Sequence, residues 1–203
     1  MLGYLGLGLL GAGAATTALR RNSGLNLSTP LAAGTGDKRP EVAIAPNGGA
    51  STDSSTALPM QMKLPDFQGI SQWLNSDPLT VAELKGSVVL IQFWTFACIN
   101  CKRTLPYITQ WHQQYADQGL RVIGIHTPEF AFERQVNNIK AALTEHGITY
   151  PVPLDNDFAT WKAYKNRYWP HLFLSDRDGI IRYDYIGEGA YSETESVIRQ
   201  LLA

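Results

Sequence analysis

A continuous apolar run at residues 88–94 (Val-Val-Leu-Ile-Gln-Phe-Trp) is the clearest pattern along the chain. Its β-branched and aromatic content predicts a buried strand. A similar run at residues 120–126 follows the turn signal Asp117-Gln118-Gly119 and predicts a second strand. Residues 101–118 between them suit a helix that contains Pro106. The three patterns together predict a strand-helix-strand unit.

Two helical patterns follow the second strand. Residues 130–146 predict a helix entered through Thr127-Pro128-Glu129, which has the order of an N-cap, a first-turn proline and a first-turn acid. Gly147 suits the C-cap of that helix. Residues 157–164 predict a short helix.

The C-terminal part of the chain predicts a hairpin and a last helix. Strands are expected at residues 171–175 and 180–186, because the intervening Asp176-Arg177-Asp178-Gly179 is a hairpin signal. Ser192 and Glu195 have capping-box spacing and open a helix that runs to residue 202. The whole order predicts an α/β fold, with a mixed central sheet flanked by helices on both faces.

The N-terminal part of the chain differs in composition. Residues 1–21 form a hydrophobic segment closed by Arg20-Arg21, with no charge before these arginines and no basic stretch ahead of the apolar run. Nineteen uncharged residues approach the 20 or so that cross a bilayer. The segment therefore predicts a membrane anchor or uncleaved signal; a cleaved signal and a misassigned start remain alternatives.

Residues 22–57 are rich in Ser, Thr, Gly, Ala and Pro without periodic hydrophobicity, which predicts a flexible linker. From residue 58 to residue 203 the pattern is globular, and its size suits one folded domain.

Overall charge and cysteine content exclude several classes of protein. The net charge of −1 gives no electrostatic reason to expect a nucleic-acid partner. Two cysteines cannot form a disulfide scaffold, and with four histidines they make a structural zinc site an unfavoured hypothesis. We therefore expect no metal and no cofactor.

The only two cysteines form the motif Cys98-Ile99-Asn100-Cys101, where the first predicted strand gives way to a helix. Cysteines three residues apart on a first helical turn can bring both sulfurs to one end of the helix. The helix dipole and the free N–H groups there favour a thiolate, which is the nucleophile in disulfide exchange. The motif therefore predicts a redox-active dithiol.

The surroundings of this dithiol resemble those of a known superfamily. Phe93-Trp94 before the motif, Pro106 after it and Trp169-Pro170 before a later strand are similar to the active site of thioredoxin-fold proteins. A closer resemblance is to the thioredoxin-like domain of DipZ-type proteins, in the TlpA/ResA-like branch. It is carried by residues 73–76, 98–106, 126–133 and 168–195. It implies a thioredoxin-like fold with a TlpA-type insertion after the second strand.

The resemblance also implies roles for individual residues. Cys98 is expected to be the exposed nucleophile and Cys101 the buried resolving thiol. Pro170 is expected to be cis, with the backbone beside it pairing with the substrate. Trp169 is expected either to flank the substrate or to pack in the core. Trp94 is expected to pack beneath the dithiol, and a place on the surface that binds the substrate is the alternative.

The proton acceptor is the point at which the chain departs from many thioredoxins. Gln92 occupies the position of their buried aspartate, and an amide cannot take up a proton at neutral pH. Water, Glu129 or Glu133 are the candidate acceptors, and stabilisation of a helix start is the structural alternative for Glu129. His126 is a further candidate next to the site. Lys102 and Arg103 either favour the thiolate or are simply solvated.

These features predict an extracytoplasmic, membrane-tethered, monomeric thiol-disulfide oxidoreductase that reduces client proteins through a mixed disulfide. The resemblance implies a separate CcdA-like membrane electron donor and a role related to cytochrome c biogenesis. Arg20 and Arg21 conflict with this location, because positive residues favour the cytoplasmic side. The alternatives are a redox-inactive thioredoxin-like binding module and a peroxiredoxin-type peroxidase.

Overall fold

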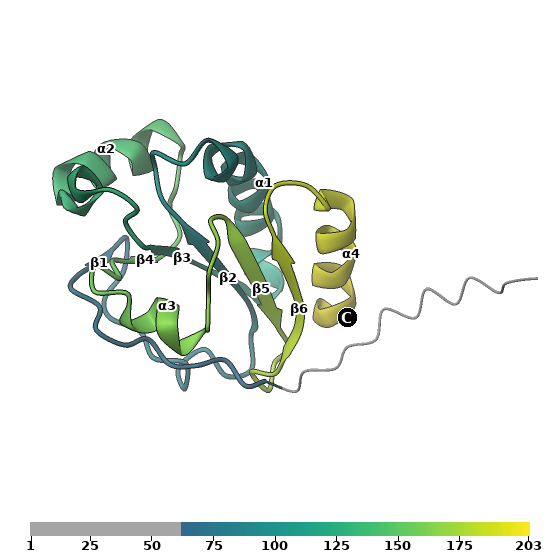
Figure 1. Cartoon of the computed structure of the whole chain (residues 1–203). Helices are drawn as coiled ribbons and strands as arrows, with labels where there is room; N and C mark the ends of the chain where they lie inside the picture. Colours follow the sequence, from purple (N-terminus) through teal and green to yellow (C-terminus); the bar gives the residue numbers. More distant parts are fainter. Residues whose placement is uncertain (1–61) are drawn as a thin grey trace, which may run out of the picture. The chain divides into compact units, whose positions relative to one another are not determined.

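The computed structural model describes residues 62–203 (Figure 1). Its main sheet has the order β3-β2-β5-β6. The central strand β2 (Val88–Trp94) pairs in parallel with β3 (Leu120–His126) and antiparallel with β5 (His171–Ser175), and β5 pairs antiparallel with β6 (Ile181–Ile186). The predicted mixed sheet and the predicted hairpin are therefore confirmed.

Alternation along β2 divides the core between the two faces of the sheet. Leu90 and Trp94 pack in one apolar cluster with side chains of α1 (Ile99–Tyr115), α2 (Val136–Glu145) and α4 (Tyr191–Leu202). Ile91 and Phe93 pack in the other cluster with α3 (Ala159–Ala163) and the segment before β2. Helices thus cover both faces, and the strand that leads into the cysteine motif is buried throughout (Figure 1).

The connection from β3 to β5 contains several short elements. It runs through the 3-10 helix η2 (Ala131–Arg134), α2, β4 (Val152–Pro153) and α3. β4 pairs antiparallel with β1 (Trp73–Leu74), and Leu154 forms a parallel bridge with His126. The connection therefore stays attached to the end of β3 that lies beside the cysteine motif.

The expected single helix over residues 130–146 is wrong. Gln135 is extended, with φ −75° and ψ 113°, and separates η2 from α2. Thr127 and Pro128 precede η2 without belonging to a helix. The reason is Glu133, whose carboxylate accepts the backbone N–H groups of Glu129 and Phe130 and holds this segment in another path.

Two helix boundaries also differ from the prediction. α1 begins at Ile99 with Cys98 as its N-cap, and the 3-10 helix η1 (Ala116–Gln118) follows it. α4 begins at Tyr191 after Ala190, whose φ is 48°, and Ser192 does not form the expected capping box. The Glu195 carboxylate instead accepts a hydrogen bond from the Tyr115 hydroxyl at 2.7 Å.

The segments predicted at 1–21 and 22–57, and the first residues of the predicted 58–203 domain, lie outside the described part of the chain. Within residues 62–203, no helix has the length and apolar character needed to cross a bilayer.

Candidate active site

Cys98 lies at the start of α1, where the helix leaves backbone donors free. Its backbone is extended, with φ −72° and ψ 117°, so it forms the N-cap. Its sulfur accepts the Cys101 backbone N–H at 3.3 Å. The side chain is partly exposed, whereas Cys101 is fully buried. The structure therefore brings the two thiols together and gives solvent access to the first of them.

The two thiols have opposite acidities. The hydrogen bond from the Cys101 side chain lowers the pKa of Cys98 to about 6, helped by the N–H groups of Cys101 and Asn100 against the effects of burial and the Glu129 charge. Burial raises the pKa of Cys101, and its bond to Cys98 raises it further. At neutral pH, Cys98 is therefore mainly a thiolate and Cys101 a thiol.

The loop before β5 forms the other wall of the site. The Trp169–Pro170 peptide bond is cis, as the resemblance implies. The Trp169 carbonyl oxygen lies 3.9 Å from the Cys98 sulfur. The Trp169 indole donates to the Thr127 carbonyl oxygen at 3.0 Å, and its ring packs on Trp161 with centroids 4.2 Å apart. This half-buried side chain fixes the loop beside the nucleophile.

Of the two roles left open for Trp94, the structure shows packing, and the alternative of flanking the substrate is corrected. Its side chain is fully buried, and its indole donates to the Gly124 carbonyl oxygen at 3.2 Å. Gly124 leaves just enough room, because a Cβ atom there would lie 3.1 Å from the indole nitrogen. Trp94 thus packs beneath the dithiol and has no surface from which to contact a substrate.

Glu133 joins the cysteine loop to the segment after β3. The side chain is fully buried. One carboxylate oxygen accepts the Thr95 hydroxyl and the Ala97 N–H, the latter at 2.9 Å. The other accepts the N–H groups of Glu129 and Phe130 at 2.7 and 2.8 Å. Two of the donors come from the cysteine loop and two from the segment after β3, so Glu133 braces the site.

This brace distinguishes the environments of the two candidate carboxylates. Burial would raise the pKa of Glu133, but the bonds from Thr95 and the three backbone N–H groups outweigh burial and lower it. A carboxylate with these four bonds and a lowered pKa is a poor proton acceptor. Glu129 is exposed, and its charge acts on Cys98. The Glu133 charge acts on Cys101 instead, so the two carboxylates affect different thiols of the pair.

His126 lies under the same network. It is fully buried, and desolvation lowers its pKa to about 4, so the ring is neutral at pH 7. Its Nε2 lies 3.3 Å from the Thr95 hydroxyl oxygen. Because Thr95 donates its one proton to Glu133, the histidine must donate from Nε2. His126 thus supports the brace from below.

Gln92 and Arg103 are held by polar groups other than the two thiols. The Gln92 side-chain amide donates to the Thr104 hydroxyl, which donates to the Cys101 carbonyl oxygen, both at 2.7 Å. Gln92 therefore steadies the first turn of α1. The exposed Arg103 is paired with Glu188 at 3.0 Å, and Lys102 is half-buried on the same turn.

The site contains residues that the sequence did not single out. Thr95 and Thr127 are both fully buried, and each links the cysteine motif or Trp169 to a neighbouring loop. Asp155 is also buried and accepts the N–H groups of Thr160 and Trp161. Thr95 and Thr127 could have been found from the sequence, because each directly follows one of the two parallel strands.

Comparison with solved structures identifies the class of fold that holds this dithiol. The thioredoxin-like superfamily protein SPOA0173 superposes with a TM-score of 0.65 at 31% identity, covering 70% of this chain and 97% of that one. The predicted thioredoxin-like fold is therefore confirmed. The model of the AhpC/TSA family matches residues 60–184, and the chain belongs to that family.

Curated relatives give the resemblance more detail. The chain is 46% identical over 154 residues to protein DipZ of Mycobacterium tuberculosis, covering 74% of this chain and 22% of DipZ. It is 28% identical over 146 residues to the thiol-disulfide oxidoreductase YkuV of Bacillus subtilis, covering 72% of this chain and 98% of YkuV. The expected resemblance to DipZ-type proteins is confirmed. YkuV is named as a thiol-disulfide oxidoreductase, which is the enzyme class expected for this chain. The chain spans about a fifth of the DipZ relatives that it matches.

We expect Glu133→Gln to lower the free energy of unfolding of the reduced protein by about 2–4 kcal/mol. The amide offers one acceptor oxygen where the structure presents donors to two. Urea unfolding at pH 7 measures the loss, and Glu129→Gln, at an exposed position, is the matched control with a change below about 0.5 kcal/mol.

The effect should depend on pH in one direction. The folded pKa of Glu133 lies below its ordinary value of 4.5, so its stabilisation is complete above that pH and is lost as pH falls through the folded pKa. The difference between wild type and Glu133→Gln should therefore shrink in acid. Equal stability of the two proteins at pH 7 would contradict the brace.

Proposed function

We propose that this domain is a thiol-disulfide oxidoreductase that reduces disulfides in client proteins. The observation that carries the proposal is the asymmetric dithiol, in which a partly exposed Cys98 has a pKa of about 6 and a buried Cys101 has a raised pKa. An accessible thiolate next to a protected thiol is the arrangement that two-step exchange requires.

In the first step, the Cys98 thiolate attacks one sulfur of the client disulfide. A bond forms between Cys98 and that sulfur, and the other client sulfur leaves as a thiolate. In the second step, Cys101 loses its proton and attacks the Cys98 sulfur. The bond between Cys98 and the client sulfur breaks as the Cys98–Cys101 bond forms, and the client sulfur leaves as a thiolate. The client has gained two electrons, and Cys98 and Cys101 have lost them and are joined as a disulfide.

We assign the proton acceptor in the second step to Glu129. The assignment rests on its exposed position, on the effect of its charge on Cys98, and on the commitment of Glu133 to four other donors. An exposed carboxylate can also exchange the proton with solvent after each turnover.

The client chain is proposed to lie along the loop that holds the cis-proline. The Trp169 N–H makes no hydrogen bond to any other described residue, and its carbonyl oxygen faces Cys98. An extended client segment that pairs with this backbone would bring its disulfide to the nucleophile. The roles of Trp169 and Pro170 are thus to shape a short backbone edge.

The proposed setting of the reaction follows from the resemblance to DipZ-type proteins. We infer that the domain acts outside the cytoplasm as a monomer, tethered by residues 1–21, and that a CcdA-like membrane protein returns it to the dithiol form. We also propose that the domain has a role related to cytochrome c biogenesis. Selective labelling of an engineered surface cysteine in intact cells tests the location; protection from a membrane-impermeant reagent would contradict it.

Reduction of insulin by dithiothreitol tests the activity. Wild type should accelerate the reaction, and Cys98→Ala and Cys101→Ala should each remove the acceleration, because each exchange step needs one of the sulfurs. Glu193→Gln, on the exposed surface of α4, serves as the control and should behave as wild type. A wild-type protein with no cysteine-dependent acceleration would instead support the binding module.

Glu129→Gln separates a base from a mere charge near Cys98. Removal of the charge lowers the pKa of Cys98, so formation of the mixed disulfide should be as fast as in wild type or faster. Loss of the proton acceptor should slow its resolution by Cys101 about tenfold or more at pH 7. Single-turnover measurements with a peptide disulfide resolve the two steps. An unchanged rate and pH dependence of resolution would refute the assignment, and Glu129→Asp should restore part of the rate.

A further inference from the structure

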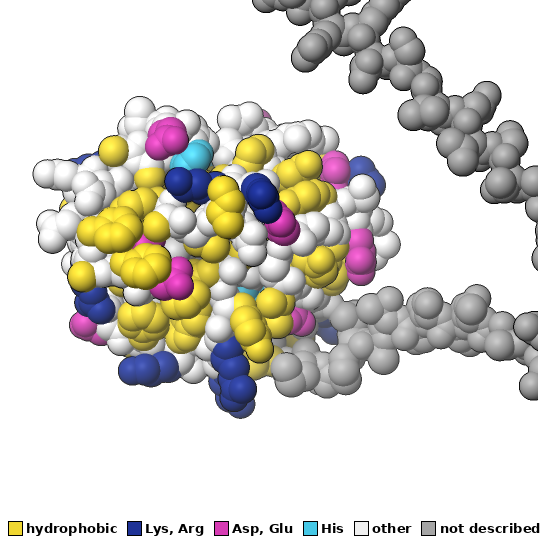
Figure 2. Space-filling model, turned by 45° about the horizontal axis from the view of Figure 1, so that its top comes forward, with side chains coloured by type: hydrophobic (Ala, Val, Ile, Leu, Met, Phe, Trp, Pro, Cys, Tyr) yellow, Lys and Arg dark blue, Asp and Glu magenta, His cyan; other side chains and the backbone are white. Residues whose placement is uncertain are grey.

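Exposed apolar side chains gather around the cysteine motif. In the described part of the chain, the exposed large apolar residues are Ile99, Tyr107, Phe130, Phe132, Tyr168 and Ile186. Four of the six lie in the segments next to Cys98, in the loop after β3 and beside Trp169. Figure 2 shows hydrophobic side chains grouped on the forward face of the domain. Such a concentration of exposed apolar surface marks an interaction site.

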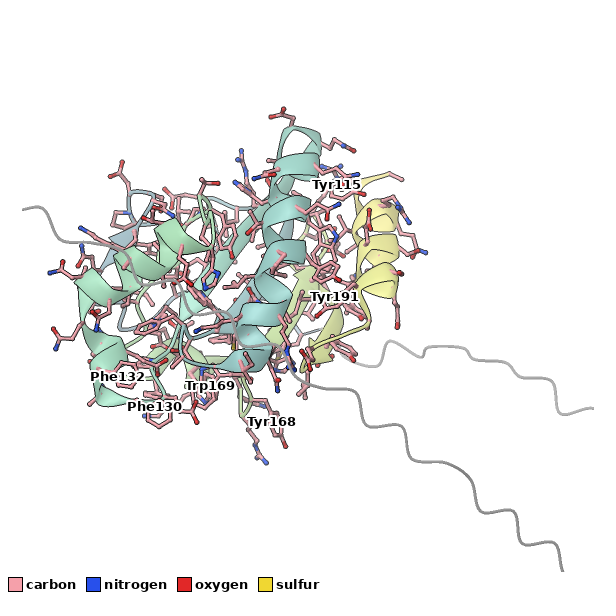
Figure 3. All side chains as sticks on the ribbon, turned by 90° about the horizontal axis from the view of Figure 1, so that it is seen from above. Tyr115, Phe130, Phe132, Tyr168, Trp169 and Tyr191 are labelled. Atoms are coloured by element: carbon pink, nitrogen blue, oxygen red, sulfur yellow. The ribbon has the colours of Figure 1, made fainter. Side chains whose placement is uncertain are left out.

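Two of these residues form a flat aromatic surface, which we name the Phe shelf and define as Phe130 and Phe132. Their rings are stacked at 7°, with centroids 5.8 Å apart, and each residue is 51% exposed. Phe132 also contacts Phe96, at 5.8 Å between centroids. In Figure 3 the shelf lies along the same side of the molecule as Trp169 and Tyr168, whereas Tyr115 and Tyr191 lie beside α4.

The Phe shelf contributes little to the core. Neither ring belongs to either of the two apolar clusters that hold the sheet and helices together. Packing in the core therefore does not explain why two large apolar rings are half exposed to water. Their position close to the loop of the nucleophile suggests a role in binding.

The Phe shelf is also held in place relative to Cys98. The Glu133 carboxylate binds the Phe130 N–H at 2.8 Å and the Ala97 N–H at 2.9 Å, so one buried group fixes both the shelf and the residue before the nucleophile. A surface that is already ordered loses little conformational entropy when a ligand binds. The shelf therefore has the properties of a preformed binding site.

We propose that the Phe shelf binds a large apolar side chain of the client polypeptide, close in sequence to the cystine under attack. This inference rests on the proposed function and names its substrate class. A client disulfide must reach the Cys98 sulfur, so the client chain has to cross the surface around it. The Cα atoms of Phe96 and Cys98 are two residues and at most about 7 Å apart. The Phe96 ring contacts Phe132 with centroids 5.8 Å apart, so the shelf lies a few side-chain lengths from the nucleophile. A short extended segment covers such a span.

The preferred substrates are then polypeptides with a phenylalanine, leucine or similar residue a few positions from the reactive cysteine. Small disulfides that lack such a side chain would reach Cys98 but leave the shelf uncovered. The shelf thus selects unfolded or extended segments, in which apolar residues near the cystine are free to bind.

The test compares two disulfide-linked peptides that are identical except for phenylalanine or serine three positions from the cysteine. Wild type should reduce the phenylalanine peptide with a kcat/KM about tenfold higher than that of the serine peptide. In the double variant Phe130→Ser with Phe132→Ser, the kcat/KM for the phenylalanine peptide should fall close to that for the serine peptide, which should be unchanged. Tyr107→Ser removes an exposed aromatic on α1 that belongs to neither the shelf nor the dithiol and should keep the wild-type ratio.

Each result is decisive for the shelf. Equal reduction of both peptides by wild type would overturn the proposal, as would an equal loss on both peptides in the double variant. A dimer of wild type that dissociates in the double variant, with the peptide ratio unchanged, would assign the shelf to a second copy instead. Failure of the proposed function is distinct, since wild type would then reduce neither peptide.

Discussion

The hydrogen bond between Cys101 and Cys98 at the first turn of α1 is the interaction on which the site depends. It stabilises the charged form of the Cys98 thiol and the neutral form of the Cys101 thiol. Two chemically identical side chains thereby become a nucleophilic thiolate and a protonated resolving thiol. The fold supplies the geometry, because β2 ends in a buried tryptophan and the chain enters α1 with Cys98 as the N-cap. Burial of Cys101 then ensures that a client meets Cys98 first.

The loop that carries this pair is held from the side by Glu133. Burying a carboxylate is costly, and here the cost is offset by four donors that would otherwise be unsatisfied near the site. The same group orders the exposed segment at residues 129–132, which supplies both a free carboxylate and the Phe shelf. One buried charge therefore joins the loop of the nucleophile to the segment that carries Glu129 and the Phe shelf.

Much of the fold was predictable from the sequence, and the failures have local physical causes. The strands β2 and β3 match their apolar runs at both ends, because continuous β-branched and aromatic content leaves few alternatives. The prediction of one helix over residues 130–146 was wrong because the Glu133 side chain turns inward and binds backbone donors. The sequence pattern does not show whether an acidic side chain points to solvent or into the protein. The capping box predicted from Ser192 and Glu195 is absent for a similar reason, because the Glu195 carboxylate binds the Tyr115 hydroxyl from α1.

The site shows the same division. Two cysteines at a strand-helix junction were enough to predict the dithiol, and the resemblance to thioredoxin-fold proteins supplied the unequal roles of its thiols. The burial of Trp94 follows from the burial of β2 on both faces, but the room for its indole depends on Gly124 in the neighbouring strand. The choice between Glu129 and Glu133 depends on side-chain direction. These are properties of contacts between distant segments, and local spacing does not contain them.

The pH dependence of Cys98 alkylation tests the central claim most directly. In reduced wild type, the rate of reaction with iodoacetamide should rise with pH about a midpoint near 6, because only the thiolate reacts and its pKa is lowered to about 6. Cys101→Ala removes the hydrogen bond and should move the midpoint toward 9, the ordinary value, whereas Cys101→Ser keeps a donor and should hold it low. A wild-type midpoint near 9, or the same midpoint in wild type and Cys101→Ala, would contradict the account.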